Sequence, residues 1–195
     1  MGTFQEVMFP KGPRQLVACC YAMEGAPAWE KSPAATLEAM MRDDYSETFR
    51  ADGINFDGLT EIEKHGVCAM LLKRIESIST EVEVQVLIAR FASIELPKTY
   101  EALRFIAGKA YQLICDGSRR IPRSRQYVAD VVFIALRPNE DKTTVYAISK
   151  RHHLSHNTVD RDESRIRKWA STIEARALER IETHFADGEV LAVRA

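Results

Sequence analysis

The stretch Thr143–Arg167, TTVYAISKRHHLSHNTVDRDESRIR, decides how the second half of this chain is expected to fold. Its pattern predicts two helices joined by a tight turn. The first helix would cover residues 145–151. Thr143 or Thr144 would cap it, because a threonine hydroxyl can accept a hydrogen bond from a backbone N–H group in the first helical turn.

The turn at residues 152–154 has His153 at the place where such turns usually have glycine. A residue at this place must accept a positive φ or change the turn, and histidine is among the more tolerant residue types. Ser155 would then cap the second helix. Ser149 is small, as the close crossing of two helices requires. The expected inward apolar positions are Val145, Ile148, Leu154, Val159 and Ile166.

This pattern fits a DNA-binding helix-turn-helix, in which the start of the second helix meets base edges in the major groove. Asparagine and arginine can contact adenine and guanine with two hydrogen bonds, whereas serine, threonine and a helix N-terminus suit phosphate. The alternative is a plain helical hairpin with a solvated polar face, which Asp160, Asp162 and Glu163 favour because carboxylates repel phosphate. The predicted DNA-binding residues of the second helix are Ser155, His156, Asn157, Thr158, Arg161 and Arg165.

A run of arginines precedes this unit, in the segment SRRIPRSR at residues 118–125. These side chains could hold the DNA backbone beside the groove, and so could the two basic residues that end the first helix of the unit. The alternative is a solvated linker. The predicted phosphate-binding residues are Arg119, Arg120, Arg123, Arg125, Lys150 and Arg151.

Charge is divided unevenly between two regions of the chain. Residues 1–116 have 12 Lys/Arg against 17 Asp/Glu, a balance of −5, and residues 117–195 have 15 against 11, a balance of +4. The basic excess therefore lies with the helix-turn-helix, as attraction to phosphate would require. We place a domain boundary here, with a helical region at 1–116 that could bind a partner and a DNA-binding domain at 117–195.

Composition is that of a globular protein with a true core, because 46% of the residues are hydrophobic and 28% are charged. No apolar run approaches the roughly 20 residues that a membrane helix needs. The first residues, MGTFQEVMFPKGPRQ, lack the pattern of a secretory signal. We therefore expect a cytoplasmic protein. Its cysteines would be reduced core residues, because Cys19, Cys20, Cys68 and Cys115 lack metal-ligand spacing.

Metal binding and catalysis find little support in the sequence. His152 and His156 are four residues apart, a spacing that can bind zinc on one helix, but the predicted turn falls between them. No glycine-rich phosphate loop and no serine nucleophile motif is present, and the carboxylates have the spacing of helix surfaces. We expect no enzyme activity, no metal and no cofactor. Partial protonation of His152, His153 and His156 near pH 6.5 could strengthen DNA binding as the pH falls.

Helical patterns cover most of the rest, so the predicted fold is all-α. Thr60 and Glu63 form a capping box ahead of a helix at 61–78, and Ser124 can cap a helix that runs to about residue 136. The segments EVEVQVLIARF and VVFIAL also fit strands, and we predict helices for both. Residues 15–23, 33–43 and 99–115 are the other predicted helices. The second helix of the turn unit would run on, or break once, and reach Phe185, and its apolar stripe would be Trp169, Ile173, Ala177 and Ile181.

The segment YAISKRHHLSHNTVDRDESRIRKWASTIEARALERIETHF resembles small phage and prophage regulators. The order of its elements is similar to the promoter-reading domain of primary sigma factors, and it looks like the Q-type late-gene antitermination proteins. The segments LTEIEKHGVCAMLLKRIESI and VEVQVLIARF resemble the upstream region of such proteins. The likeness covers about residues 58–186. This sequence departs from the family pattern at His153, and it lacks the zinc-type cysteine cluster that some of these proteins have.

This resemblance implies a transcription regulator that works in a bacterial host cell. A Q-like protein binds double-stranded DNA near a late promoter, joins a paused RNA polymerase and makes it read through terminators. One alternative is a dimeric repressor or activator that acts only at initiation and dimerises through residues 168–186. A second alternative is a helical interaction module that does not contact DNA.

Overall fold

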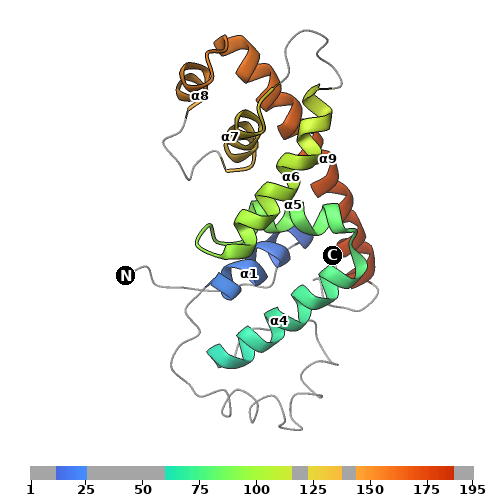
Figure 1. Cartoon of the computed structure of the whole chain (residues 1–195). Coiled ribbons are helices and arrows are strands. Elements are labelled where there is room, and N and C mark those ends of the chain that lie inside the picture. Colours follow the sequence, from blue (N-terminus) through green and yellow to red (C-terminus); the bar gives the residue numbers. More distant parts are fainter. Residues whose placement is uncertain (1–11, 26–59, 116–122, 138–143, 187–195) are drawn as a thin grey trace. The chain divides into compact units, whose positions relative to one another are not determined.

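The computed structural model describes residues 12–25, 60–115, 123–137 and 144–186, and within them the chain is entirely helical (Figure 1). The predicted all-α class is therefore confirmed. No described helix is long and apolar enough to cross a membrane. The helices are α1 (Pro13–Gly25), α4 (Glu61–Ile78), α5 (Glu81–Phe91), α6 (Pro97–Cys115), α7 (Arg125–Leu136), α8 (Val145–Arg151) and α9 (His156–Ala186).

Local capping interactions explain where several of these helices begin. Thr60 and Glu63 form the predicted capping box, in which the Thr60 backbone N–H donates to Glu63 Oε2 at 2.7 Å. The Ser124 hydroxyl accepts a hydrogen bond from the Tyr127 backbone N–H at 3.1 Å, which starts α7 as predicted. The helix expected at 33–43 lies outside the described residues.

The two segments that also fitted strands, at residues 81–91 and 131–136, are both helical. Their β-branched side chains are used for packing, because Val86, Val131 and Val132 are fully buried. Burial of one helix face outweighs the modest preference of valine for strands. The helix predicted for both segments is confirmed.

The described helices fall into two compact units, of which the first contains α1, α4, residues 91–93 and the last turns of α9 from Ala177. Helix α1 packs on α4, and fully buried side chains such as Leu16 and Ile75 fill this unit. Arg74 Nε donates a hydrogen bond to His184 Nε2 at 2.8 Å, which ties α4 to the end of α9. All four cysteines are free thiols.

The second unit contains most of α5, then α6, α7, α8 and α9 as far as Arg176. Helix α6 packs on α7, and α7 packs on α8. The domain boundary predicted at residues 116–117 lies outside the described residues, between these packed helices α6 and α7. Arg137 is buried after α7, and its Nε donates to the carbonyl of Ala89 at 2.5 Å, which fixes α7 against α5.

Helix α9 is a single helix of 31 residues, so the helix that begins after the turn runs on without a break. Ile166, Ala170, Ala177 and Ile181 are fully buried along one face. Trp169 and Ile173, which belonged to the predicted apolar stripe, are only half-buried. The buried face is therefore rotated slightly from the expected one.

Candidate nucleic-acid interface

The turn between α8 and α9 takes one of the two forms that the sequence left open, in which residue 153 accepts a positive φ. His153 has a φ of 52°, the only positive φ of a non-glycine residue among the described residues. The Thr144 hydroxyl caps α8 by accepting from the Ala147 N–H at 3.2 Å. The Leu154 N–H donates to the carbonyl of Ser149 at 3.0 Å, so the chain closes back on α8 before α9 begins. The two helices and their turn are confirmed.

Ser155 opens α9 as its predicted cap. Its Oγ accepts a hydrogen bond from the Thr158 N–H at 3.2 Å, and the two hydroxyls lie 2.8 Å apart. The Ser155 side chain is exposed, whereas Thr158 is half-buried. Ser155 therefore combines helix capping with a place on the surface at the positive end of the α9 dipole.

The outer face at the start of α9 displays three of the predicted base-contacting residues, because His156, Asn157 and Arg161 are all exposed. The Arg161 side chain is 64% exposed, although its Nε lies 3.8 Å from an oxygen of Asp162. Arg165 is also exposed, but one of its terminal nitrogens donates to the carbonyl of Leu113 at 3.4 Å. Arg161 is therefore the freer of the two guanidinium groups.

Two of the three carboxylates that favoured a plain hairpin point into the protein. Asp162 is 1% exposed and accepts a hydrogen bond of 2.8 Å from the Tyr127 hydroxyl. Glu163 is 4% exposed and forms an ion pair with Arg167. Burial raises the pKa of Glu163, and Arg167 opposes that rise. Only Asp160 of the three is exposed, so this objection to a phosphate-binding surface is largely removed.

Arg123 has an internal role, which corrects its expected place in a phosphate clamp. It is 8% exposed, and its Nε lies 3.5 Å from Asp162 Oδ2. Its guanidinium carbon lies 5.5 Å from the centre of the Tyr127 ring. A buried carboxylate needs a nearby cation, and Arg123 fills this need for Asp162. Of the other arginines in the run, Arg125 is exposed. Arg119 and Arg120 lie outside the described residues.

The end of α8 adds two exposed basic residues beside the turn. The Lys150 ammonium lies 4.5 Å from the centre of the Tyr146 ring, a cation–π contact on the outer face of α8. The Arg151 side chain is 55% exposed, and its Nη1 lies 2.9 Å from Asp130 Oδ2. Lys150 and Arg151 are therefore on the surface, as a role in phosphate binding requires.

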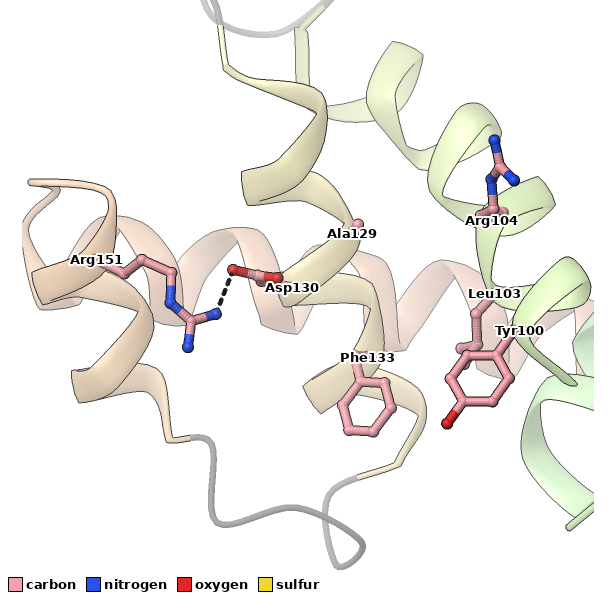
Figure 2. Close-up of a pocket in the computed structure, with 7 residues that line it drawn as sticks. All are labelled: Tyr100, Leu103, Arg104, Ala129, Asp130, Phe133 and Arg151. Carbon is pink, nitrogen blue, oxygen red and sulfur yellow. Dashed lines mark hydrogen bonds and ion pairs between the residues drawn. The ribbon is translucent and has the colours of Figure 1, made fainter. Parts of the chain in front are cut away.

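Asp130 of α7 holds the turn in place through two neighbouring side chains. One carboxylate oxygen contacts Arg151 at 2.9 Å and His152 Nε2 at 2.8 Å (Figure 2 shows the contact with Arg151). Burial raises the pKa of Asp130, but hydrogen bonds from His152, Arg151 and Gln126 outweigh burial and lower it below its usual value. The ionised form of Asp130 is thus the one that fastens α8 to α7.

The histidines of this region do not come together as a metal site. Instead, His152 contacts Asp130 and meets the edge of the Tyr127 ring, with the ring centres 5.4 Å apart. Throughout the parts of the chain that the structure describes, no group of three or more His, Cys, Asp or Glu side chains could hold a metal ion.

Sequence reasoning missed Asp130, Tyr127 and Tyr146. Asp130 interrupts the otherwise apolar segment VADVVFIAL, and such a lone carboxylate is a signal for an internal polar contact. Tyr146 is the only aromatic residue of α8, and it is 56% exposed. An exposed aromatic residue beside a basic one is a signal for a binding surface.

None of the protein-family models searched matches this chain, and no curated protein sequence matches it.

Proposed function

We propose that α8 and α9 form a helix-turn-helix that binds double-stranded DNA, with the start of α9 in the major groove. The observation that carries this proposal is the separation of charge at the start of α9. The exposed side chains are those of Ser155, Asn157 and Arg161, whereas the carboxylates of Asp162 and Glu163 are buried. A solvated hairpin has no need for such a separation.

Each exposed residue has a role that its chemistry suits. Asn157 and Arg161 would contact base edges, because their side chains can form paired hydrogen bonds with adenine and guanine. Ser155 and the N-terminus of α9 would contact a phosphate. Lys150, Arg151 and Arg125 would contact the DNA backbone on either side of the groove, with His156 and Arg165 at the edge of the interface.

The regulator that this interface would serve is an antitermination factor acting on RNA polymerase, as the resemblance to Q-type proteins implies. The acidic N-terminal region, with a balance of −5 over residues 1–116, would supply the contact with polymerase in the bacterial cytoplasm. The test is transcription in vitro across a terminator, with the upstream promoter DNA present. Read-through that rises with added protein supports this role, and unchanged termination contradicts it.

A repressor or activator acting only at initiation is the second candidate. It was expected to dimerise through the apolar stripe of residues 168–186. In the structure, Ala177 and Ile181 of this stripe are buried within the chain itself, whereas Trp169 and Ile173 are half-buried. The buried part of the stripe is not available to a second copy, which counts against dimerisation through the whole stripe.

The test of DNA binding compares an arginine pair with a third arginine of the same helix in the full chain. Arg161→Ala combined with Arg165→Ala should weaken binding to DNA selected from a random-sequence pool by more than about tenfold, since each contact contributes about 1–3 kcal/mol. Arg176→Ala is the matched control. It is exposed on α9 and about 22 Å further along, at 1.5 Å per residue. If the double variant binds DNA as tightly as the wild type, or if the wild type does not bind DNA, the alternative of a helical interaction module without DNA contact is favoured.

The salt dependence of the same binding tests the phosphate contacts. If about 4–6 phosphates are neutralised, the logarithm of affinity should fall with the logarithm of salt concentration at a slope of about −4 to −5. Lys150→Gln should reduce this slope by about 1. A flat response would exclude the proposed backbone contacts.

A further inference from the structure

A surface pocket lies between α6, α7 and α8, beside the proposed DNA-binding unit. Its volume is about 360 Å³, which lies at the lower end of the range for small-ligand sites. Figure 2 shows Tyr100, Leu103 and Arg104 on α6, and Ala129, Asp130 and Phe133 on α7. Arg151 at the end of α8 completes the lining. Such a volume suits a compound with one ring system rather than a nucleotide.

Aromatic surface is available inside this pocket. The Tyr100 side chain is 57% exposed, which makes it the most exposed large hydrophobic residue of the described chain. Phe133 is half-buried and lines the same pocket. Two rings at one site favour a flat apolar body, because aromatic groups gain from ring contacts beyond the burial of area.

Charge in the pocket favours an anion. Arg104 is exposed, and none of the described residues forms an ion pair or hydrogen bond with it. Asp130 is the one acidic residue in the lining, and both Arg151 and His152 contact it. The negative charge of the pocket is therefore already paired, whereas the Arg104 guanidinium is available. A guanidinium group binds a carboxylate with two parallel hydrogen bonds, and a carboxylate on a single ring system fits this volume.

We propose that this pocket binds a small aromatic carboxylate, with its ring against Tyr100 and Phe133 and its carboxylate on Arg104. Arg151, whose contact with Asp130 fastens α8 to α7, belongs to the same lining. Ligand binding is thereby linked to the helix-turn-helix. Added negative charge in this pocket reduces the attraction of the neighbouring α8 for phosphate, so the ligand weakens DNA binding.

The first experiment measures binding of 2-naphthoate to the full chain by calorimetry, with 2-naphthamide as the uncharged comparison. The expected Kd for naphthoate is submillimolar, and the amide should bind at least tenfold more weakly. Arg104→Gln should weaken naphthoate at least tenfold, and Tyr100→Ala several-fold. Arg176→Gln is the matched control and should change the Kd by less than twofold. Equal binding of acid and amide, or an unchanged Kd for Arg104→Gln, overturns the proposal.

A second variant tests the sign of the electrostatic argument. Asp130→Asn removes the negative charge from the pocket lining. It should tighten naphthoate binding about threefold or more and leave the amide unchanged. Weaker binding of naphthoate to this variant would overturn the argument that the charge of the pocket selects an anion. Amide-proton NMR shifts should locate the ligand at Tyr100, Ala129 and Phe133, and shifts confined to other residues would refute this site.

The regulatory part rests on the proposed DNA binding, whereas ligand binding is independent of it. Saturating naphthoate should lower the DNA affinity of the wild type about threefold to tenfold and leave that of Arg104→Gln unchanged. If naphthoate binds and DNA affinity does not move, the linkage is refuted. If naphthoate binds and the chain has no affinity for DNA, the proposed function fails while the ligand site stands.

Discussion

The two units of this protein differ in what they bury. Every buried charged side chain in the described residues belongs to the second unit, and these residues are Glu83, Arg123, Arg137, Asp162, Glu163 and Glu174. In the first unit, the described side chains that are buried belong to apolar residues, to Cys20 and Cys68, and to Tyr21. Apolar packing tolerates changes of shape, whereas a buried ion pair needs defined geometry. The unit with the proposed DNA-binding surface is therefore the one whose core specifies orientation most narrowly.

The largest effect is expected from Asp162→Ala, which leaves Arg123 buried without its carboxylate. The free energy of unfolding should fall by about 3–5 kcal/mol, as measured by urea denaturation. Asp160→Ala is the control, because Asp160 is exposed on the same turn, and it should cost less than about 0.5 kcal/mol. Adding Arg123→Met to Asp162→Ala should restore part of the loss, since the pair is then replaced by apolar volume. Similar losses for Asp160 and Asp162 would remove the contrast between the units.

A smaller and graded effect is expected in the first unit from Ile75, which is fully buried on α4. Ile75→Ala should lower the free energy of unfolding by about 2–4 kcal/mol, and Ile75→Val by about 1 kcal/mol. The same denaturation measurement shows whether the loss follows the volume removed. If Ile75→Val costs as much as Ile75→Ala, this unit has geometric requirements like those of the second one.

The turn should respond to its backbone conformation rather than to burial, because His153 is exposed. His153→Val places a β-branched residue at a φ of 52° and should lower the free energy of unfolding by about 1–2 kcal/mol. His153→Gly should be close to neutral or slightly stabilising, because glycine adopts this φ without strain. Thermal unfolding of the three proteins provides the comparison. A stable valine variant would mean that the turn can change its shape.

The smallest effect is expected from the pH dependence of Asp130. Its pKa is lowered in the folded state, so its contribution to stability is present above its unfolded value of about 4 and is lost as the pH falls through the folded value. The difference in unfolding free energy between wild type and Asp130→Asn should therefore be constant near pH 5 and shrink below about pH 4. A difference that grows on acidification would mean that the folded pKa is raised.

Much of the helical framework could be predicted because its signals are local. Thr60, Ser124 and Ser155 act as caps within three residues of their partners, and the positive φ of His153 follows from a turn of fixed length. The all-α class followed from such signals together with apolar spacing.

The parts of the site that could not be predicted depend on contacts between distant residues. Arg123 was placed with a phosphate-binding run because nothing near it in sequence indicates Asp162, its partner. The inward direction of Asp162 did have a signal. It follows Val159 by three residues and precedes Ile166 by four, so helical periodicity places it on the buried face. The charge of Asp162 alone suggested that it lies at the surface, but the helical periodicity predicted its position correctly.

The positive φ of His153 also bears on how the sequence of this turn can change during evolution. Codons for Asp and Asn each differ from a histidine codon at a single base, and both residues accept a positive φ at least as well as histidine does. Glycine cannot be reached from a histidine codon by a single-base change. Point mutation can therefore vary the charge displayed at residue 153 while the chain between α8 and α9 keeps its course. A lineage starting from this sequence would be expected to alternate among His, Asn and Asp there before it acquired glycine.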